Sequence, residues 1–158
     1  MDALELRDNA KQQLQEIRTI ETGIDYLNKV KAIETWAKAE KKDAELQKII
    51  AEQKLRTQRI LGGLLKESNV SKNTSNQYLL GSKDKPSTLT SMGISKVESH
   101  TFQKIASLPE ETFEKEIETA KAETNKRIEL TTSRMLKIAK QYELDKKRDI
   151  ESEKEKLA

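Results

Sequence analysis

The sequence of 158 residues contains no cysteine, only two prolines and five glycines, and six aromatic side chains. The lack of cysteine excludes a disulfide framework, a thiolate nucleophile and a cysteine-based zinc site. It also fits the reducing cytoplasm, where we expect the protein to reside. Because aromatic residues are scarce and the hydrophobic fraction is 34%, a broad globular core is difficult to assemble.

Long apolar runs are also missing. No segment approaches the roughly 20 apolar residues that a membrane-spanning helix needs. The first fifteen residues, MDALELRDNAKQQLQ, lack the apolar segment of a signal peptide. We therefore expect neither export nor a membrane partner.

What the sequence does contain is charge and helix-forming residues. Charged residues make up 36% of the chain, and Lys, Glu, Ala and Leu lead the composition. Apolar residues recur at helical spacing in three early segments, beginning near Ala3, after the TIETG interruption, and after Asp43, which is a suitable N-cap. These patterns predict an all-α protein, with Trp36 as an anchor between the early helices.

The composition divides the chain into three parts. Residues 1–67 form an amino-terminal helical hairpin or bundle and are the candidate for dimerisation, residues 68–86 form a polar, flexible linker, and residues 87–158 form a helix-turn-helix lobe with a long last helix. The final part of that helix, after Leu144, is almost entirely charged, so we expect it to fray. The Gly62-Gly63 pair does not complete a P-loop and indicates close helix packing or fraying.

The positive charge lies in the middle of the sequence. Residues 1–67 carry 13 basic and 12 acidic side chains, and residues 109–158 carry 12 and 13. Residues 68–108 carry 5 and 2, so they account for the net charge of +3. A local basic excess is what contact with a phosphate backbone requires, although a solvated linker would show the same bias.

The stretch MGISKVESHTFQKIASLPEE, residues 92–111, has the parts of a DNA-binding helix-turn-helix. Leu89 and Met92 would belong to a short first helix, Gly93 to the turn, Ile94 to the core, and Ser95 to the N-cap of the second helix. The inward face of the second helix would comprise Val97, Phe102, Ile105 and Ala106. The outward face would comprise Lys96, Glu98, Ser99, His100, Gln103 and Lys104.

The outward side chains suit nucleic acid. Gln can bond adenine, Lys can bond guanine or phosphate, and Ser can bond either, so we take Lys96, Ser99, His100, Gln103 and Lys104 as candidate DNA-binding residues. No arginine occurs in residues 60–126, although arginine makes the commonest specific base contact. Two interpretations stay open: a helix that contacts DNA, and a corner that only sets the angle between structural helices.

Two segments resemble known proteins. LTSMGISKVESHTFQKIASLPEETFEKEI and AEQKLRTQRILGGLLKE are similar to consecutive blocks of small helical proteins encoded by bacteriophages and integrated elements, and the resemblance covers most of residues 22–122. The first block also resembles the helix-turn-helix of ParB-type partition proteins. The resemblance implies a phage-like DNA-binding accessory or regulatory protein.

A second class of function is a protein-interaction factor that binds and modulates, or inhibits, a host or phage protein such as a defence or replication enzyme. An enzymatic function is the least favoured, because His100 is the only histidine and offers no catalytic pair within one chain. We expect no cofactor and no metal. The predicted partners are duplex DNA and a second copy of the chain.

Overall fold

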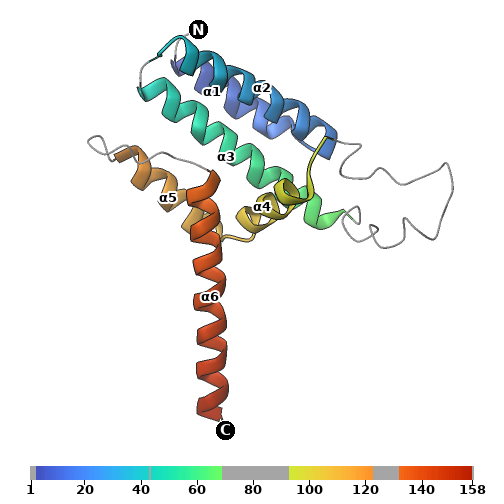
Figure 1. The fold of residues 1–158 in the computed structure, drawn as a ribbon, viewed down its shortest axis with the longest axis vertical. Helices are drawn as coiled ribbons and strands as arrows, with labels where there is room; N and C mark the ends of the chain where they lie inside the picture. The colour runs from blue at the N-terminus through green and yellow to red at the C-terminus, as the bar shows by residue number, and fades with distance from the viewer. Residues whose placement is uncertain (1–2, 43, 69–92, 123–131, 158) are drawn as a thin grey trace, which may run out of the picture.

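The computed structural model describes residues 3–42, 44–68, 93–122 and 132–157. Within these ranges the chain is built from helices, with no strand, which confirms the all-α fold class. The helices are α1 (Ala3–Glu16), α2 (Ile20–Ala39), α3 (Ala44–Glu67), α4 (Lys96–Ala106), α5 (Glu110–Ala122) and α6 (Thr132–Leu157) (Figure 1). None of the helices in these ranges combines the length and apolar composition that crossing a membrane would demand.

The first three helices lie side by side, as the short connections predict (Figure 1). The break before α2 is set by Thr19, whose hydroxyl accepts from the Thr22 amide while the Thr22 side chain accepts from the Thr19 amide, forming a capping box. Trp36 is 49% exposed and its ring centroid lies 5.0 Å from the Lys42 ammonium, so its predicted role as an anchor between the early helices is not supported. The apolar stripe of α2 instead turns Leu27, Val30 and Ala37 inward.

Helix α3 is the centre of the molecule, because each of three apolar clusters contains residues from it. Val30, Ala37 and Ile50 join α2 to α3. A second cluster adds α4 and the turn before it, and consists of Ile24, Leu27, Leu61, Leu65, Ile94 and Phe102. The third joins α3 to α4, α5 and α6, and consists of Leu55, Ile105, Leu108, Phe113, Ile117, Met135 and Ala139.

These clusters do not follow the predicted division of the chain into two lobes. Residues 1–67 and 87–158 do not form separate cores, because α3 packs against α4 along one face and supplies Leu55 to the cluster beneath α5 and α6. Helix α3 has apolar side chains that α1 and α2 do not cover, and these side chains pack against the later helices. Residues 69–86 of the predicted linker, and Leu89 and Met92 of the predicted first helix, lie outside the described residues.

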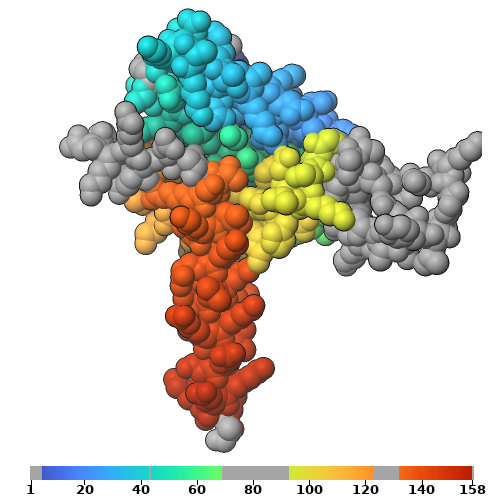
Figure 2. All heavy atoms as spheres, viewed as in Figure 1, coloured from blue at the N-terminus to red at the C-terminus, as the bar shows by residue number. Residues whose placement is uncertain are grey.

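Helix α6 leaves the body of the molecule. Its first half packs through Met135, Ala139 and Tyr142, whereas residues 144–157 are exposed and extend away from the other helices (Figures 1 and 2). The helix continues to Leu157. The segment that we expected to fray is therefore a helix without tertiary support, whose charged residues can pair along its surface.

Candidate nucleic-acid interface

The turn that precedes α4 follows the expected local pattern. Gly93 has φ of +87°, a conformation that favours glycine. Ile94 is buried in the cluster with Phe102, and the Ser95 hydroxyl accepts a hydrogen bond of 3.1 Å from the Glu98 amide. The expected turn residue, core residue and N-cap are thus confirmed, and they fix where α4 begins.

The inner face of α4 is narrower than predicted. Phe102 and Ile105 are buried against α3, as expected. Val97 is 75% exposed, so its predicted inward orientation is wrong. The reason is helical rotation: Phe102 and Ile105 define the face against α3, and Val97 lies roughly a third of a turn away from their mean direction.

The outer face retains two of the candidate DNA-binding residues as exposed side chains. Lys96 lies in the first turn of α4 and His100 one turn later. Residues four apart share a helix face, so both present polar nitrogen to the same side. This is the strip of α4 that a flat or convex polyanion could reach.

Ser99 does not belong to that strip, and its prediction as an outward DNA-contacting residue is wrong in orientation. The side chain is 2% exposed, because position 99 lies one turn before Phe102 on the face against α3. Its hydroxyl accepts a hydrogen bond of 3.0 Å from Gln103 Nε2. Gln103 is half-buried, and its amide nitrogen is therefore engaged within α4 rather than free to bond a base.

Lys104 is also engaged within the chain. Its ammonium lies 2.5 Å from a carboxylate oxygen of Glu143, on α6. This hydrogen bond lowers the pKa of Glu143 from its ordinary value, against the opposing effect of desolvation, and Coulombic interactions with Lys104, Lys147 and His100 lower that pKa further. Residues of two helices that are far apart in sequence thus meet at one carboxylate.

Two arginines of α3 hold the far end of α4 and the start of α5, a role that the sequence pattern did not reveal. Arg59 donates to the carbonyl oxygens of Ile105 at 3.1 Å and Leu108 at 2.8 Å, and its guanidinium lies 4.8 Å from the ring centroid of Phe113. These carbonyls lie at the end of α4, where the last carbonyl oxygens lack the usual helical donors, and the Ile105 oxygen also accepts from the Leu108 amide at 3.2 Å. The burial of Arg59 lowers its pKa from the ordinary value.

Arg56 extends this framework to α5. It makes two hydrogen bonds to the Glu114 carboxylate, of 2.5 and 2.9 Å, and also contacts Glu52. Glu52 is 7% exposed and bonds Lys121 as well, at 2.9 Å. The spacing of Arg56 and Arg59 places both on one side of α3 and was the available signal, but it does not say which helix that side meets.

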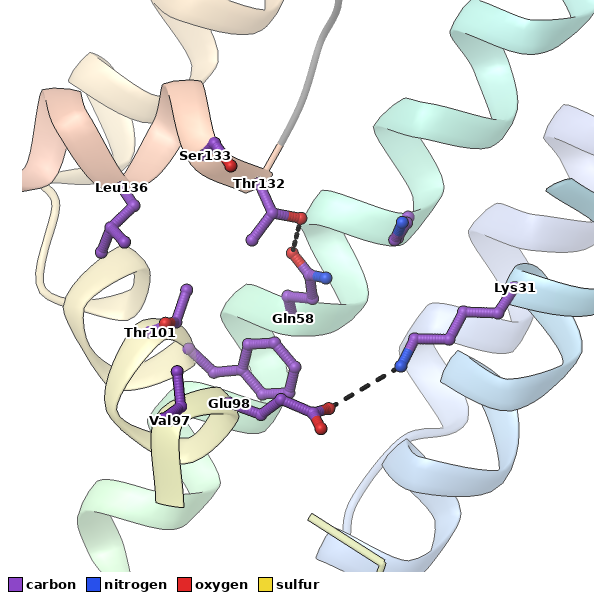
Figure 3. A pocket seen from close by; sticks show the side chains of 10 residues that line it. Lys31, Gln58, Val97, Glu98, Thr101, Thr132, Ser133 and Leu136 are labelled. Atoms are coloured by element: carbon purple, nitrogen blue, oxygen red, sulfur yellow. Dashed lines mark hydrogen bonds and ion pairs between the residues drawn. The ribbon is translucent and has the colours of Figure 1, made fainter. Parts of the chain in front are cut away.

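A groove of about 330 Å³ lies between α2, α3, α4 and the start of α6 (Figure 3). Thr132 donates to the Gln58 amide oxygen at 2.9 Å on one wall, and Lys31 pairs with Glu98 at 3.7 Å across the opening. Phe102 and Leu136 supply apolar lining, and Val97 lies at the same groove. In the described parts of the chain, no three His, Asp or Glu side chains are grouped as metal ligands would be.

Comparison with known proteins adds no constraint on function. No family model matches the sequence, and no curated protein and no solved structure shows significant similarity to it. The features that bear on function are therefore those of the geometry around α4.

Proposed function

We propose that the protein binds duplex DNA through the outer face of α4, as an accessory or regulatory factor of a phage-like element in the cytoplasm. The proposal rests on one observation: the amino-terminal end of α4 is held in place while polar side chains on it stay exposed. The turn at Gly93, the buried Ile94 and the Ser95 cap fix its amino-terminal end, while Lys96 and His100 stay exposed there. A rigidly held helix with exposed polar residues in its first two turns is the arrangement that reads a major groove in helix-turn-helix proteins.

The local charge supports this proposal. The basic excess of residues 68–108 includes Lys96 and Lys104, and sequence-independent affinity for DNA comes from such cations through counterion release. Lys96 can contact a phosphate or guanine, and His100 can donate to a phosphate oxygen. With Ser99 buried and Gln103 bonded within its own helix, few side chains remain for base recognition, so binding that depends mainly on the DNA backbone is expected.

A single α4 offers few contacts, so a dimer that places two copies of α4 on neighbouring half-sites belongs to the proposal. The mass of the protein in solution tests this part separately. Light scattering across micromolar concentrations should show a dimer, and the mass of one chain throughout would remove the dimer while leaving monomeric DNA binding open.

The test of DNA binding compares Lys96→Gln with Lys11→Gln. Lys11 is exposed on α1, distant in sequence from α4, and its replacement removes the same single charge. Binding to a mixed-sequence duplex should weaken with rising salt for the unmodified chain, and Lys96→Gln should lower the slope of that dependence by about 0.9, as expected for one lost phosphate contact. Lys11→Gln should leave the slope unchanged. An equal decrease of the salt slope in both variants would contradict a role for α4 in DNA binding.

A second candidate function is binding of a host or phage protein, and the exposure of Val97 favours it. A branched apolar side chain that is 75% exposed beside a groove containing Phe102 and Leu136 could insert into, or receive, an apolar side chain of a partner. Val97→Asp separates the two functions. It should abolish capture of a protein partner by adding a charge to an apolar contact, and it should weaken DNA binding only modestly, since no phosphate contact is removed.

A further inference from the structure

One face of α6 lies beside the outer side chains of α4. Lys140, Glu143 and Lys147 are spaced by three and four residues, so they share one side of the helix. Glu143 bonds Lys104, which shows that this side points toward α4. Together with His100, these side chains form what we call the α4–α6 corner (His100, Lys104, Lys140, Glu143 and Lys147).

The corner is predominantly basic. Helix α6 runs away from the body of the molecule beside α4, so the two helices form the walls of an open angle (Figures 1 and 2). Three lysines stand against one carboxylate in it, and Lys140 and Lys147 are exposed to solvent. The lowered pKa of Glu143 has the hydrogen bond from Lys104 as its largest cause, and Lys147 and His100 contribute electrostatically. An anionic surface entering the angle would meet cations on both walls.

We propose that the α4–α6 corner grips the phosphate backbone of duplex DNA, with Lys140 and Lys147 of α6 as contacts and with Lys104 shared between Glu143 and a phosphate. This inference rests on the proposed function, because it places a second helix beside the same duplex. Helix α6 has 26 residues, of which only the first half packs on the body, so Lys147 in its exposed half can reach a backbone without breaking the fold. The contact ends there, because Glu151 follows Lys147 on the same face of the helix.

Glu143 acts against this contact. Its carboxylate neutralises Lys104 at 2.5 Å and repels a phosphate that approaches from the same side. A DNA phosphate must therefore compete with Glu143 for the Lys104 ammonium. Binding should consequently be weaker than three free lysines would give, and no steeper in its dependence on salt, because a lysine paired with Glu143 releases fewer counterions from DNA.

The test uses two double variants of the full chain that remove the same charge. Lys140→Gln with Lys147→Gln removes the corner lysines. Lys137→Gln with Arg148→Gln removes two exposed cations from nearly the same levels of α6, and helical periodicity turns these away from α4. Binding of each protein to a mixed-sequence duplex is measured over a series of salt concentrations. The corner variant should lower the salt slope by about two, and the matched variant should leave it nearly unchanged.

A third variant, Glu143→Gln, tests the competition. It removes the negative charge while keeping the shape of the side chain, so affinity for DNA should rise severalfold at low salt. Weaker binding by Glu143→Gln, or equal slopes for the two double variants, would overturn the inference while leaving DNA binding by α4 intact. If the unmodified chain shows no salt-dependent binding, the proposed function fails and the corner inference fails with it.

Discussion

Gly62 of α3 and Phe102 of α4 meet backbone to backbone. A Cβ atom built on Gly62 would lie 1.9 Å from the Phe102 carbonyl oxygen, far inside van der Waals contact, whereas one built on the neighbouring Gly63 would meet nothing within 4 Å. The glycine pair that resembled part of a phosphate-binding loop thus serves close helix packing at its first member. This contact determines how deeply α4 sits on α3, and hence which α4 side chains remain exposed.

Gly62→Ala is expected to destabilise the protein by about 1–3 kcal/mol, the usual range for overpacking, because a backbone carbonyl must move to admit the new methyl group. Gly63→Ala is the matched control within the same helix. It should stabilise the protein by about 0.4–1 kcal/mol, since alanine restricts the unfolded chain and meets no obstacle. Urea denaturation followed by circular dichroism measures both, and equal effects would contradict the close approach of α3 and α4.

Arg59→Met should destabilise the protein by about 1–3 kcal/mol. The substitution keeps much of the aliphatic volume but removes the side-chain donor to the carbonyl oxygens of Ile105 and Leu108, of which the Ile105 oxygen keeps the Leu108 amide. Arg18→Met, at an exposed position between α1 and α2, should change stability by less than about 0.5 kcal/mol. Thermal unfolding of the two variants checks the difference, and an unaffected Arg59→Met protein would remove the role of Arg59 in anchoring α4.

The pairing of Arg56 with Glu114 predicts a loss of stability in acid. The hydrogen bonds from Arg56 lower the pKa of the Glu114 carboxyl from its ordinary value of 4.5, more than its desolvation raises it. A carboxyl whose pKa is lower in the folded state stabilises the fold above its unfolded pKa, and this contribution disappears as the pH falls below 4.5 and through the folded pKa.

Glu114→Gln should accordingly lower the melting temperature at pH 7 and flatten its dependence on pH below about 4.5. Glu118→Gln provides the control, because Glu118 lies one turn later on α5 and is largely exposed. A melting profile of Glu114→Gln that runs parallel to the profile of the unmodified chain would show that the bidentate pair does not form in solution.

Ser99→Ala tests the corrected orientation of α4. The buried hydroxyl accepts a hydrogen bond from Gln103, so its removal should lower the free energy of unfolding by about 1 kcal/mol. The affinity for DNA should remain unchanged. Fluorescence anisotropy with a labelled duplex measures that affinity. A large loss of binding in a folded Ser99→Ala protein would restore Ser99 as a contact residue and would require α4 to rotate away from the position described here.

The sequence was sufficient for the helices and insufficient for their packing. Apolar spacing predicted the all-α fold class, and Gly93, Ile94 and Ser95 predicted the local start of α4, because turns and caps depend on neighbouring residues. The separation into two lobes was not supported, since periodicity does not show that one α3 stripe serves three different helices. The predicted orientations of three side chains were wrong for a related reason: Ser99, Val97 and Trp36. Which face of a helix is buried depends on the neighbouring helix that packs against it.

The residues at the candidate site show the same limit. Lys96 and His100 are exposed as expected, but Lys104 is paired with Glu143, which lies 39 residues later. Pairings at that separation follow from the packing of α4 beside α6, and no local pattern contains them. The α4–α6 corner could therefore be recognised only in the folded chain.

The most direct test of DNA binding by α4 is a titration of the isotope-labelled full chain with a mixed-sequence duplex, followed by nuclear magnetic resonance of the backbone amides. We expect chemical-shift changes to concentrate in residues 93–104, with a second group around Lys140 and Lys147. They should diminish as salt is added, because counterion release contributes to binding. Absence of shift changes at low salt, or changes confined to α1 and α2, would show that α4 does not bind DNA.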